Sequence, residues 1–190
     1  FEISNANNVS LQGNVDIFQE VIFTNGRIVP NTNALTLSQT AIATPAEGRV
    51  NSYVNGRLYK LMGAGTSFTF PIGSSSLWRY GSVNSPSGGV RTWYMEYIYA
   101  PPTSNPLVDN LTACSSTILR ISAGEYWKVG DDGASGLSAR IGLSWGIESD
   151  VSATLSEREA LQVMVWNDGT SCWNERGGTS PARARARGGA

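Results

Sequence analysis

The stretch VSLQGNVDIFQEVIFTNGRIVPNTNALTL, residues 9–37, decides the fold class of this chain of 190 residues. Apolar and polar side chains alternate along residues 9–23, with Gly13 as a break, and this is the period of a β-strand with one buried face. Asn25-Gly26 then predicts a tight turn, because both residues tolerate a positive φ. The residues of this stretch that are predicted to face inward are Val15, Ile17, Val21 and Phe23.

Two more short strands are predicted at residues 27–29 and 35–37, with a turn at 31–33 between them. Strands of this length joined by Asn and Gly turns are typical of β-solenoid rungs, which stack in parallel around a narrow apolar interior. We therefore interpret residues 1–44 as a β-solenoid-like segment or as an edge sheet against the rest of the protein. Ordinary antiparallel hairpins are the alternative interpretation.

Strand-like segments separated by Gly, Pro and Asn continue to residue 166, and their spacing favours an all-β, antiparallel β-sandwich of the jelly-roll type. Asn55-Gly56 echoes the earlier Asn-Gly pair and predicts a second turn or a repeated hairpin. Residues 74–89 are rich in Ser and Gly and are predicted to be loops, and 155–161 is the segment with helical character. The predicted strands are 52–61, 66–73, 90–100, 116–123, 125–129, 139–145 and 160–166.

Residues 41–48, with a Pro-Ala pair and a Gly, mark a candidate boundary between structural segments. The sequence therefore predicts a solenoid-like or edge segment at 1–44 and a β-sandwich domain at 45–178. Residues 179–190 form a low-complexity tail in which three arginines alternate with alanine. We expect this tail to be a solvated terminus, because three charges are too few for a nucleic-acid arm.

The composition limits the classes of function. Charged residues make up only 15% of the chain, against about 25% in a typical domain. The net charge of −1 gives no basic face for nucleic acid, and no apolar run is long enough to predict a membrane span. Histidine, the commonest general base and metal ligand, is absent from the sequence. These features make a triad hydrolase or a zinc enzyme an unfavourable prediction.

The two cysteines are Cys114 and Cys172. Either they are two small buried side chains, or they form one disulfide that closes a long loop. A disulfide over such a loop would stabilise the fold by roughly 3–5 kcal/mol in the chain-entropy model, and it would fit an oxidising compartment.

Aromatic residues are candidates for a carbohydrate site, because sugar rings stack on exposed Trp and Tyr faces. Most of them lie on strand patterns, where packing in the core is the expected role. Trp78 and Tyr80 lie in the segment predicted to be a loop, and they are therefore the candidate glycan-stacking residues. The aromatic residues considered are Trp78, Tyr80, Trp93, Tyr94, Tyr97, Tyr99, Trp127, Trp145, Trp166 and Trp173.

Acidic residues offer two further hypotheses. Loop carboxylates near Gly can bind Ca²⁺, although their spacing here is not that of an EF-hand and turn formation explains them equally well. A glycosidase needs two carboxylates across a cleft, and Glu96 and Glu125 on predicted strands are the candidates. Edge charges that prevent aggregation account for the same pair, so we expect no catalytic site. The loop carboxylates are Asp131, Asp132, Glu148 and Asp150.

Five phrases in order give the chain a resemblance to domains of secreted Bacteroidetes cell-surface proteins exported by type IX secretion. They are NVDIFQEVIFTNGRIVPNTNALTLS (14–38), SYVNGRLYK with GTSFTFPIG (52–73), GEYWKV (124–129), ARIGLSW (139–145) and ALQVMVWNDGTSCWNERG (160–177). The resemblance implies adhesins, gliding-associated proteins or polymer-forming scaffolds, outside the cell and without a shared catalytic motif. In this family one or two closing strands usually follow, where this chain has its Arg-Ala tail.

The expected function is therefore that of a non-enzymatic structural or adhesive module, with filament formation as one form of it. Its expected partners are copies of itself or neighbouring domains of a longer surface protein. A carbohydrate-binding module of a secreted enzyme is the alternative. No cofactor is expected apart from the Ca²⁺ considered above.

Overall fold

The computed structural model describes residues 1–100, 124–133, 138–149, 163–167 and 172–175. The chain divides into two compact units. The first contains Phe1–Tyr99 and Trp127–Ser144, and the second contains Ala100–Tyr126 and Trp145–Ala190. Almost all regular structure in the described residues is β, which confirms the all-β prediction.

The strands are β1 (Glu2–Ser4), β2 (Val9–Ser10), β3 (Val15–Ile17), β4 (Glu20–Asn25), β5 (Ile28–Val29), β6 (Leu35–Leu37), β7 (Ile42–Thr44), β8 (Val54–Asn55), β9 (Leu58–Met62), β10 (Ser67–Ser74), β11 (Leu77–Asn84), β12 (Arg91–Ile98), β13 (Tyr126–Asp131), β14 (Arg140–Leu143), β15 (Met164–Asn167) and β16 (Cys172–Glu175). A short 3₁₀ helix, η1, spans Ile147–Ser149.

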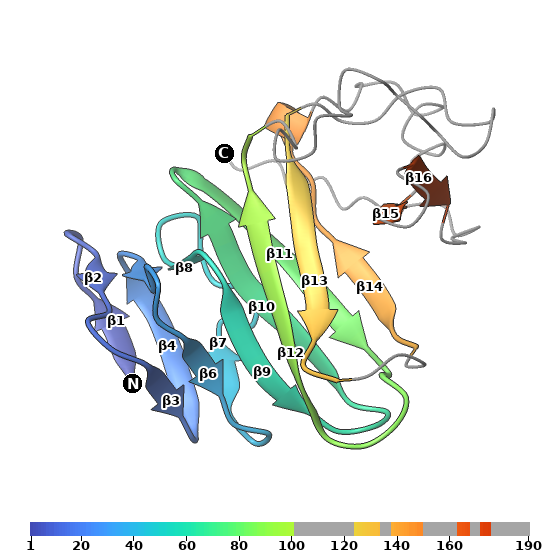
Figure 1. Cartoon of the computed structure of the whole chain (residues 1–190). Coiled ribbons are helices and arrows are strands. Elements are labelled where there is room, and N and C mark those ends of the chain that lie inside the picture. Colours follow the sequence, from blue (N-terminus) through green and yellow to red (C-terminus); the bar gives the residue numbers. More distant parts are fainter. Residues whose placement is uncertain (101–123, 134–137, 150–162, 168–171, 176–190) are drawn as a thin grey trace. The chain divides into compact units, whose positions relative to one another are not determined.

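The N-terminal strands form three stacked rungs of a β-solenoid (Figure 1). The first rung is β1–β2–β3, the second is β4–β5–β6 and the third is β7–β8–β9. Each strand pairs in parallel with the corresponding strand of the next rung, as in Ile3 opposite Phe23 and Val15 opposite Leu35. The predicted solenoid-like segment is therefore confirmed, and the alternative of antiparallel hairpins over residues 1–44 is wrong.

Longer strands continue two of the solenoid sheets (Figure 1). β10 pairs in parallel with β8 and antiparallel with β11, and β11 pairs antiparallel with β14. On the other sheet, β12 pairs antiparallel with β9, and β13 follows it. The two large sheets thus mix parallel and antiparallel pairs, and this topology does not confirm an antiparallel jelly roll. Residue 45, the predicted boundary, lies inside the first unit.

One hydrophobic core runs from the first rung to β12, because most inward positions of these strands are apolar. Val21 and Phe23 are fully buried, and Ile17 is nearly so, which confirms the inward face predicted for them. Trp93 and Tyr97 are buried on β12, where they alternate with partly exposed residues as expected. The ring of Trp127 on β13 packs 5.0 Å from that of Tyr97.

The prediction of loops over residues 74–89 is wrong at its centre, where β11 forms an eight-residue strand. Its small residues serve packing rather than turning. A Cβ at Gly81 would lie 2.3 Å from the sulfur of Met95 on β12, so only glycine leaves room for that side chain. The Ser and Gly residues of segment 74–89 therefore concealed the regular alternation of β11.

The two Asn-Gly pairs are corners between sheets and not hairpin turns. Asn25-Gly26 links β4 to β5, and Asn55-Gly56 links β8 to β9, and neither pair of flanking strands is hydrogen-bonded to each other. Gly26 and Gly56 both have a positive φ, which glycine adopts readily. The predicted repeated hairpin is therefore wrong, although both pairs do redirect the chain.

In the second unit, the described residues include η1 and the antiparallel pair β15–β16. No helix in the described part of the chain is long and apolar enough to cross a membrane. Some sequence-based predictions lie outside the described residues. These are the strand at 116–123, the helical segment at 155–161, the tail at 179–190, Cys114 and Asp150.

Candidate functional surfaces

Trp78 and Tyr80 lie on β11, on the face of the six-stranded sheet that points away from the core. Arg79, between them, is buried, so strand alternation directs the two rings outward. Both side chains are partly exposed, and their ring centroids are 5.6 Å apart at an interplanar angle of 40°. The indole Nε1 of Trp78 donates a hydrogen bond of 2.7 Å to the carbonyl oxygen of Glu47, which fixes the ring.

A buried tyrosine lies beside the strand partner of Trp78. Tyr53 is fully buried, and its ring lies against Gly73, the partner of Trp78 on β10: a Cβ at Gly73 would be 2.5 Å from Cε2 of Tyr53. The Tyr53 hydroxyl donates to the carbonyl oxygen of Ser75 at 2.8 Å. Burial raises the pKa of Tyr53, while nearby Arg27 partly opposes this change. Tyr53 is thus a buried ring beside the strand partner of Trp78, and Trp78 and Tyr80 are the partly exposed rings.

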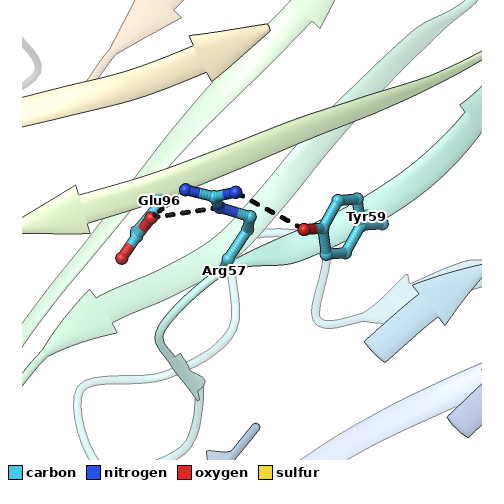
Figure 2. Close-up of polar contacts among 3 residues, drawn as sticks. All are labelled: Arg57, Tyr59 and Glu96. Atoms are coloured by element: carbon cyan, nitrogen blue, oxygen red, sulfur yellow. Dashed lines mark hydrogen bonds and ion pairs between the residues drawn. The ribbon is translucent and has the colours of Figure 1, made fainter. Parts of the chain in front are cut away.

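A charged cluster lies on the outer face of the five-stranded sheet (Figure 2). Arg57 Nη2 and Nε donate to one carboxylate oxygen of Glu96, at 2.8 and 3.1 Å. Arg57 Nη1 lies 3.5 Å from the hydroxyl oxygen of Tyr59, and the guanidinium carbon is 4.5 Å from the ring centroid of Tyr94. Burial lowers the pKa of Arg57, but Tyr59 and Glu96 outweigh it and raise the pKa overall.

Glu96 therefore has a defined partner, and that partner is structural. Glu125, the other candidate carboxylate, is partly exposed and directly precedes β13. Glu96 belongs to the first compact unit and Glu125 to the second. The expectation of no catalytic site therefore stays a prediction.

The candidate Ca²⁺-binding carboxylates make turn contacts where they are described. Asp131 Oδ1 accepts a hydrogen bond from the backbone N–H of Gly133 at 2.6 Å, and Asp132 Oδ1 accepts one from the N–H of Thr92 at 3.1 Å. A hydrogen bond with the side chain of Thr92 is the main cause of a lowered pKa at Asp132, and the backbone bond from Thr92 adds to it. Glu148 lies in η1. Among the described residues, no three His, Cys, Asp or Glu side chains gather as a metal site would require.

Cys172 begins β16, is buried and is disulfide-bonded. The other cysteine of the sequence, Cys114, lies outside the described residues, so their pairing stays a prediction.

Sequence reasoning missed a buried lysine on β9. Lys60 points into the solenoid between Leu58 and Met62, with only 4% of its surface exposed. Its ammonium donates hydrogen bonds to the carbonyl oxygens of Ser38 and Gln39, the second at 2.8 Å. Desolvation lowers its pKa from 10.5 to about 8. The sequence signal was available, because position 60 falls on the inward register of the alternating segment 58–62.

The first rung of the solenoid has one neighbouring rung among the described residues. Among the described strands, β1, β2 and β3 each pair with one neighbour only, in the second rung. The first rung therefore contributes the edge strand of each of the three sheets that run through the solenoid (Figure 1). Unpaired strand edges are templates for further pairing, which makes this end a candidate interaction surface.

Comparison with known proteins gives no relative: no protein-family model, no curated protein and no solved structure matches this chain.

Proposed function

We propose that this chain is a non-enzymatic structural or adhesive module of a secreted bacterial surface protein, and that its open solenoid end docks with a neighbouring module. The observation that carries this proposal is that β1, β2 and β3 are edge strands, each paired on one side only among the described residues. Backbone pairing along such edges, with apolar pockets between them, is an established mode of protein association. Contacts that do not close into a ring would extend the assembly into a filament.

The uncharged polar composition and the resemblance to type IX-secreted surface proteins support an extracellular location. The finer fold that we propose is a solenoid whose last rung continues into two facing sheets, with a sandwich-like, jelly-roll-related second half. In this arrangement the two halves differ in role. The rungs provide the docking end, and the longer strands with their shared apolar core provide a rigid body.

A proline at Ser10 tests the role of the open end. The backbone N–H groups of Val9 and Leu11 donate to the carbonyl oxygens of Arg27 and Val29 in the second rung. Because successive residues of a strand direct their N–H groups to opposite sides, the N–H of Ser10 points away from the second rung. Ser10→Pro removes this outward donor and blocks strand addition without breaking a bond to the second rung. Ser10→Ala is the matched control, since it keeps the N–H.

The measurement is electron microscopy and fractionation of cells that produce each variant. We expect the wild-type chain and Ser10→Ala to be found in assemblies at the cell surface, and Ser10→Pro to be released as folded monomers. Thermal unfolding of the purified variants checks that Ser10→Pro remains folded. Release of all three chains as monomers would overturn the proposal.

A carbohydrate-binding module is the second candidate, because Trp78 and Tyr80 form a partly exposed, fixed aromatic pair. A glycan array with Trp78→Ala and Tyr80→Ala tests it. Tyr94→Ala is the control, since the face of that ring is already covered by Arg57. Binding that is lost in the first two variants and kept in the third would favour this candidate.

A further inference from the structure

The outer face of β10 and β11 consists of uncharged side chains. Strand alternation directs four residues of each strand away from the core, since Phe70, Ile72 and Val83 between them are buried in it. The register sets these outward residues side by side, as in Ser82 opposite Thr69. None of the eight is charged, and they are Ser67, Thr69, Pro71, Gly73, Trp78, Tyr80, Ser82 and Asn84.

The polar half of this face is held in a fixed arrangement. The Nδ2 of Asn84 donates to the Oγ of Ser82 at 2.8 Å and lies 3.5 Å from the carbonyl oxygen of Arg140 on β14. Because the Ser82 oxygen accepts this bond, its own O–H can donate to a ligand. Gly142, opposite Ser82 on β14, leaves the space clear, since a Cβ there would lie 2.5 Å from the Ser82 oxygen. With Thr69 on the other side, these side chains form a partly exposed polar row.

The aromatic half of the face has the geometry for two successive sugar units. A pyranose ring has an apolar C–H face, which stacks on an aromatic ring, and hydroxyl groups around its rim. The ring centroids of Trp78 and Tyr80 are 5.6 Å apart, close to the advance of one sugar unit along a polysaccharide. The strand from Trp78 to Asn84 is about 20 Å long, which accommodates several sugar units.

The tilt between the two aromatic rings restricts the shape of the ligand. Their planes are inclined at 40°, so a flat ribbon of sugars cannot lie face-on against both rings at once. A chain whose successive sugar rings are turned relative to each other can do so. The geometry therefore favours a single soluble chain over the surface of a crystalline polysaccharide.

The outer face of the other large sheet provides a comparison. There the guanidinium carbon of Arg57 lies 4.5 Å from the ring centroid of Tyr94, and Arg57 is paired with Glu96. A sugar that stacked on this side of Tyr94 would displace a paired charge. The outward residues of β10 and β11 place no such charge over their rings, and they form no basic row that would attract an acidic polymer.

We infer that the outer face of β10 and β11 binds a single, uncharged polysaccharide chain that runs along β11. Two successive sugar units stack on Trp78 and Tyr80, and the hydroxyl groups of the following units hydrogen-bond to Ser82, Asn84 and Thr69. This inference rests on the adhesive form of the proposed function and on its aromatic pair, and it adds the class of ligand and the polar contacts.

The dependence of affinity on chain length tests the inference. The probes are neutral arabinoxylan, mixed-linkage glucan and galactomannan, with fragments of two, four and six sugar units from the polymer that binds most tightly. We expect the wild-type chain to bind at least one of these polymers, and affinity to rise from two units to six as the fragment reaches Ser82 and Thr69. Calorimetry measures the polymers, and an NMR titration of the Trp78 indole signal measures the fragments.

Two variants separate the polar row from the aromatic pair. Thr69→Val and Ser82→Ala should each weaken binding of the six-unit fragment by about 2- to 10-fold, because each removes a hydrogen bond. The two-unit fragment, which covers the aromatic pair alone, should bind both variants as it binds the wild type. Thr36→Val is the matched control, because Thr36 is partly exposed on the outer face of the other large sheet. Thermal unfolding checks that all variants remain folded.

Four results would overturn the inference. They are binding to none of the three polymers, preference for crystalline cellulose or for a sulfated polysaccharide, equal affinity for the two-unit and six-unit fragments, and unchanged affinity of the six-unit fragment in both variants.

The outcome is separable from that of the cell-surface experiment. Assembly that depends on Ser10, without polysaccharide binding, would leave the docking function standing and refute this ligand. Polysaccharide binding by a chain that is released as monomers would support the ligand and refute the docking function.

Discussion

Lys60 makes the stability of this protein depend on pH in a direction that can be calculated. Its ammonium lies inside the solenoid, and its pKa falls from 10.5 to about 8 because burial disfavours the charged form. In the unfolded chain the lysine regains its ordinary pKa, near 10.4. The folded and unfolded states therefore bind different numbers of protons between about pH 8 and pH 10.4.

The sign follows from proton linkage. Below pH 8 both states hold the proton, and the folded state bears the full cost of the buried charge. Between pH 8 and 10.4 the unfolded chain holds more protons than the folded one, so the free energy of unfolding rises with pH. The whole gap corresponds to about 3 kcal/mol, with a slope near pH 9 of about 1 kcal/mol per pH unit. These are upper values, since the carbonyl oxygens of Ser38 and Gln39 favour the ammonium.

Urea unfolding followed by tryptophan fluorescence at pH 7.5, 8.5 and 9.5 measures this effect. The range stops below pH 10, because the raised pKa of Tyr53 lowers stability once tyrosines ionise in the unfolded chain. Lys60→Met is the comparison, and it should lose the rise with pH whatever its own stability. An NMR titration of the Lys60 Cε signal gives the pKa independently. Equal pH dependence in the two proteins, or a titration near 10.5, would refute the reasoning.

Three further predictions concern the rungs and the outer face. Gly26→Ala should lower the free energy of unfolding by about 2–3 kcal/mol, because Gly26 has a positive φ and an added Cβ would clash with Asn5. Gly65 also has a positive φ but has open space around it, so Gly65→Ala should lower it by only about 1 kcal/mol. Urea unfolding measures both variants. Phe23→Ala should cost about 3–5 kcal/mol in thermal unfolding, whereas Phe18→Ala, at a residue 70% exposed, should change little, and equal losses would contradict the burial pattern. A double-mutant cycle of Arg57→Met and Glu96→Gln should give a coupling energy of about 0.2–1 kcal/mol, because both side chains are partly exposed. This coupling should shrink in high salt. A coupling energy above about 2 kcal/mol would contradict the expected screening of the pair by solvent.

Alternation along a strand is a local property, and it was readable from the sequence. Val21 and Phe23 were assigned to the core for that reason, and both are buried. Which strand becomes a neighbour is not local. Val9 pairs with Ile28, and Ile28 pairs with Val54, so successive rungs differ in length and leave no fixed period in the sequence. The short strands therefore indicated rungs without excluding hairpins.

The same limit explains why the two Asn-Gly pairs predict a repeated hairpin that the structure does not contain. Asn25 and Asn55 look equivalent in sequence, but they lie at different corners of the solenoid. The true equivalents of Asn25 are Asn5 and Asn51, which share hydrogen bonds with it and have different neighbours in the chain. A corner is recognised by what stacks on it, and the sequence of a single rung does not contain that information.

Glycines that serve packing explain why the sequence around Trp78 and Tyr80 predicts a loop where the structure has a strand. Gly73 and Gly81 lie within strands because the Tyr53 ring and the Met95 sulfur occupy the space of a Cβ, yet glycine in sequence favours a loop. The sequence predicts Trp78 and Tyr80 to be exposed loop residues. They are partly exposed on a strand instead, and the Trp78 ring is held by its hydrogen bond to Glu47. A ring fixed in this way loses little conformational entropy on binding, so the rigid strand favours ligand recognition more than the predicted loop would.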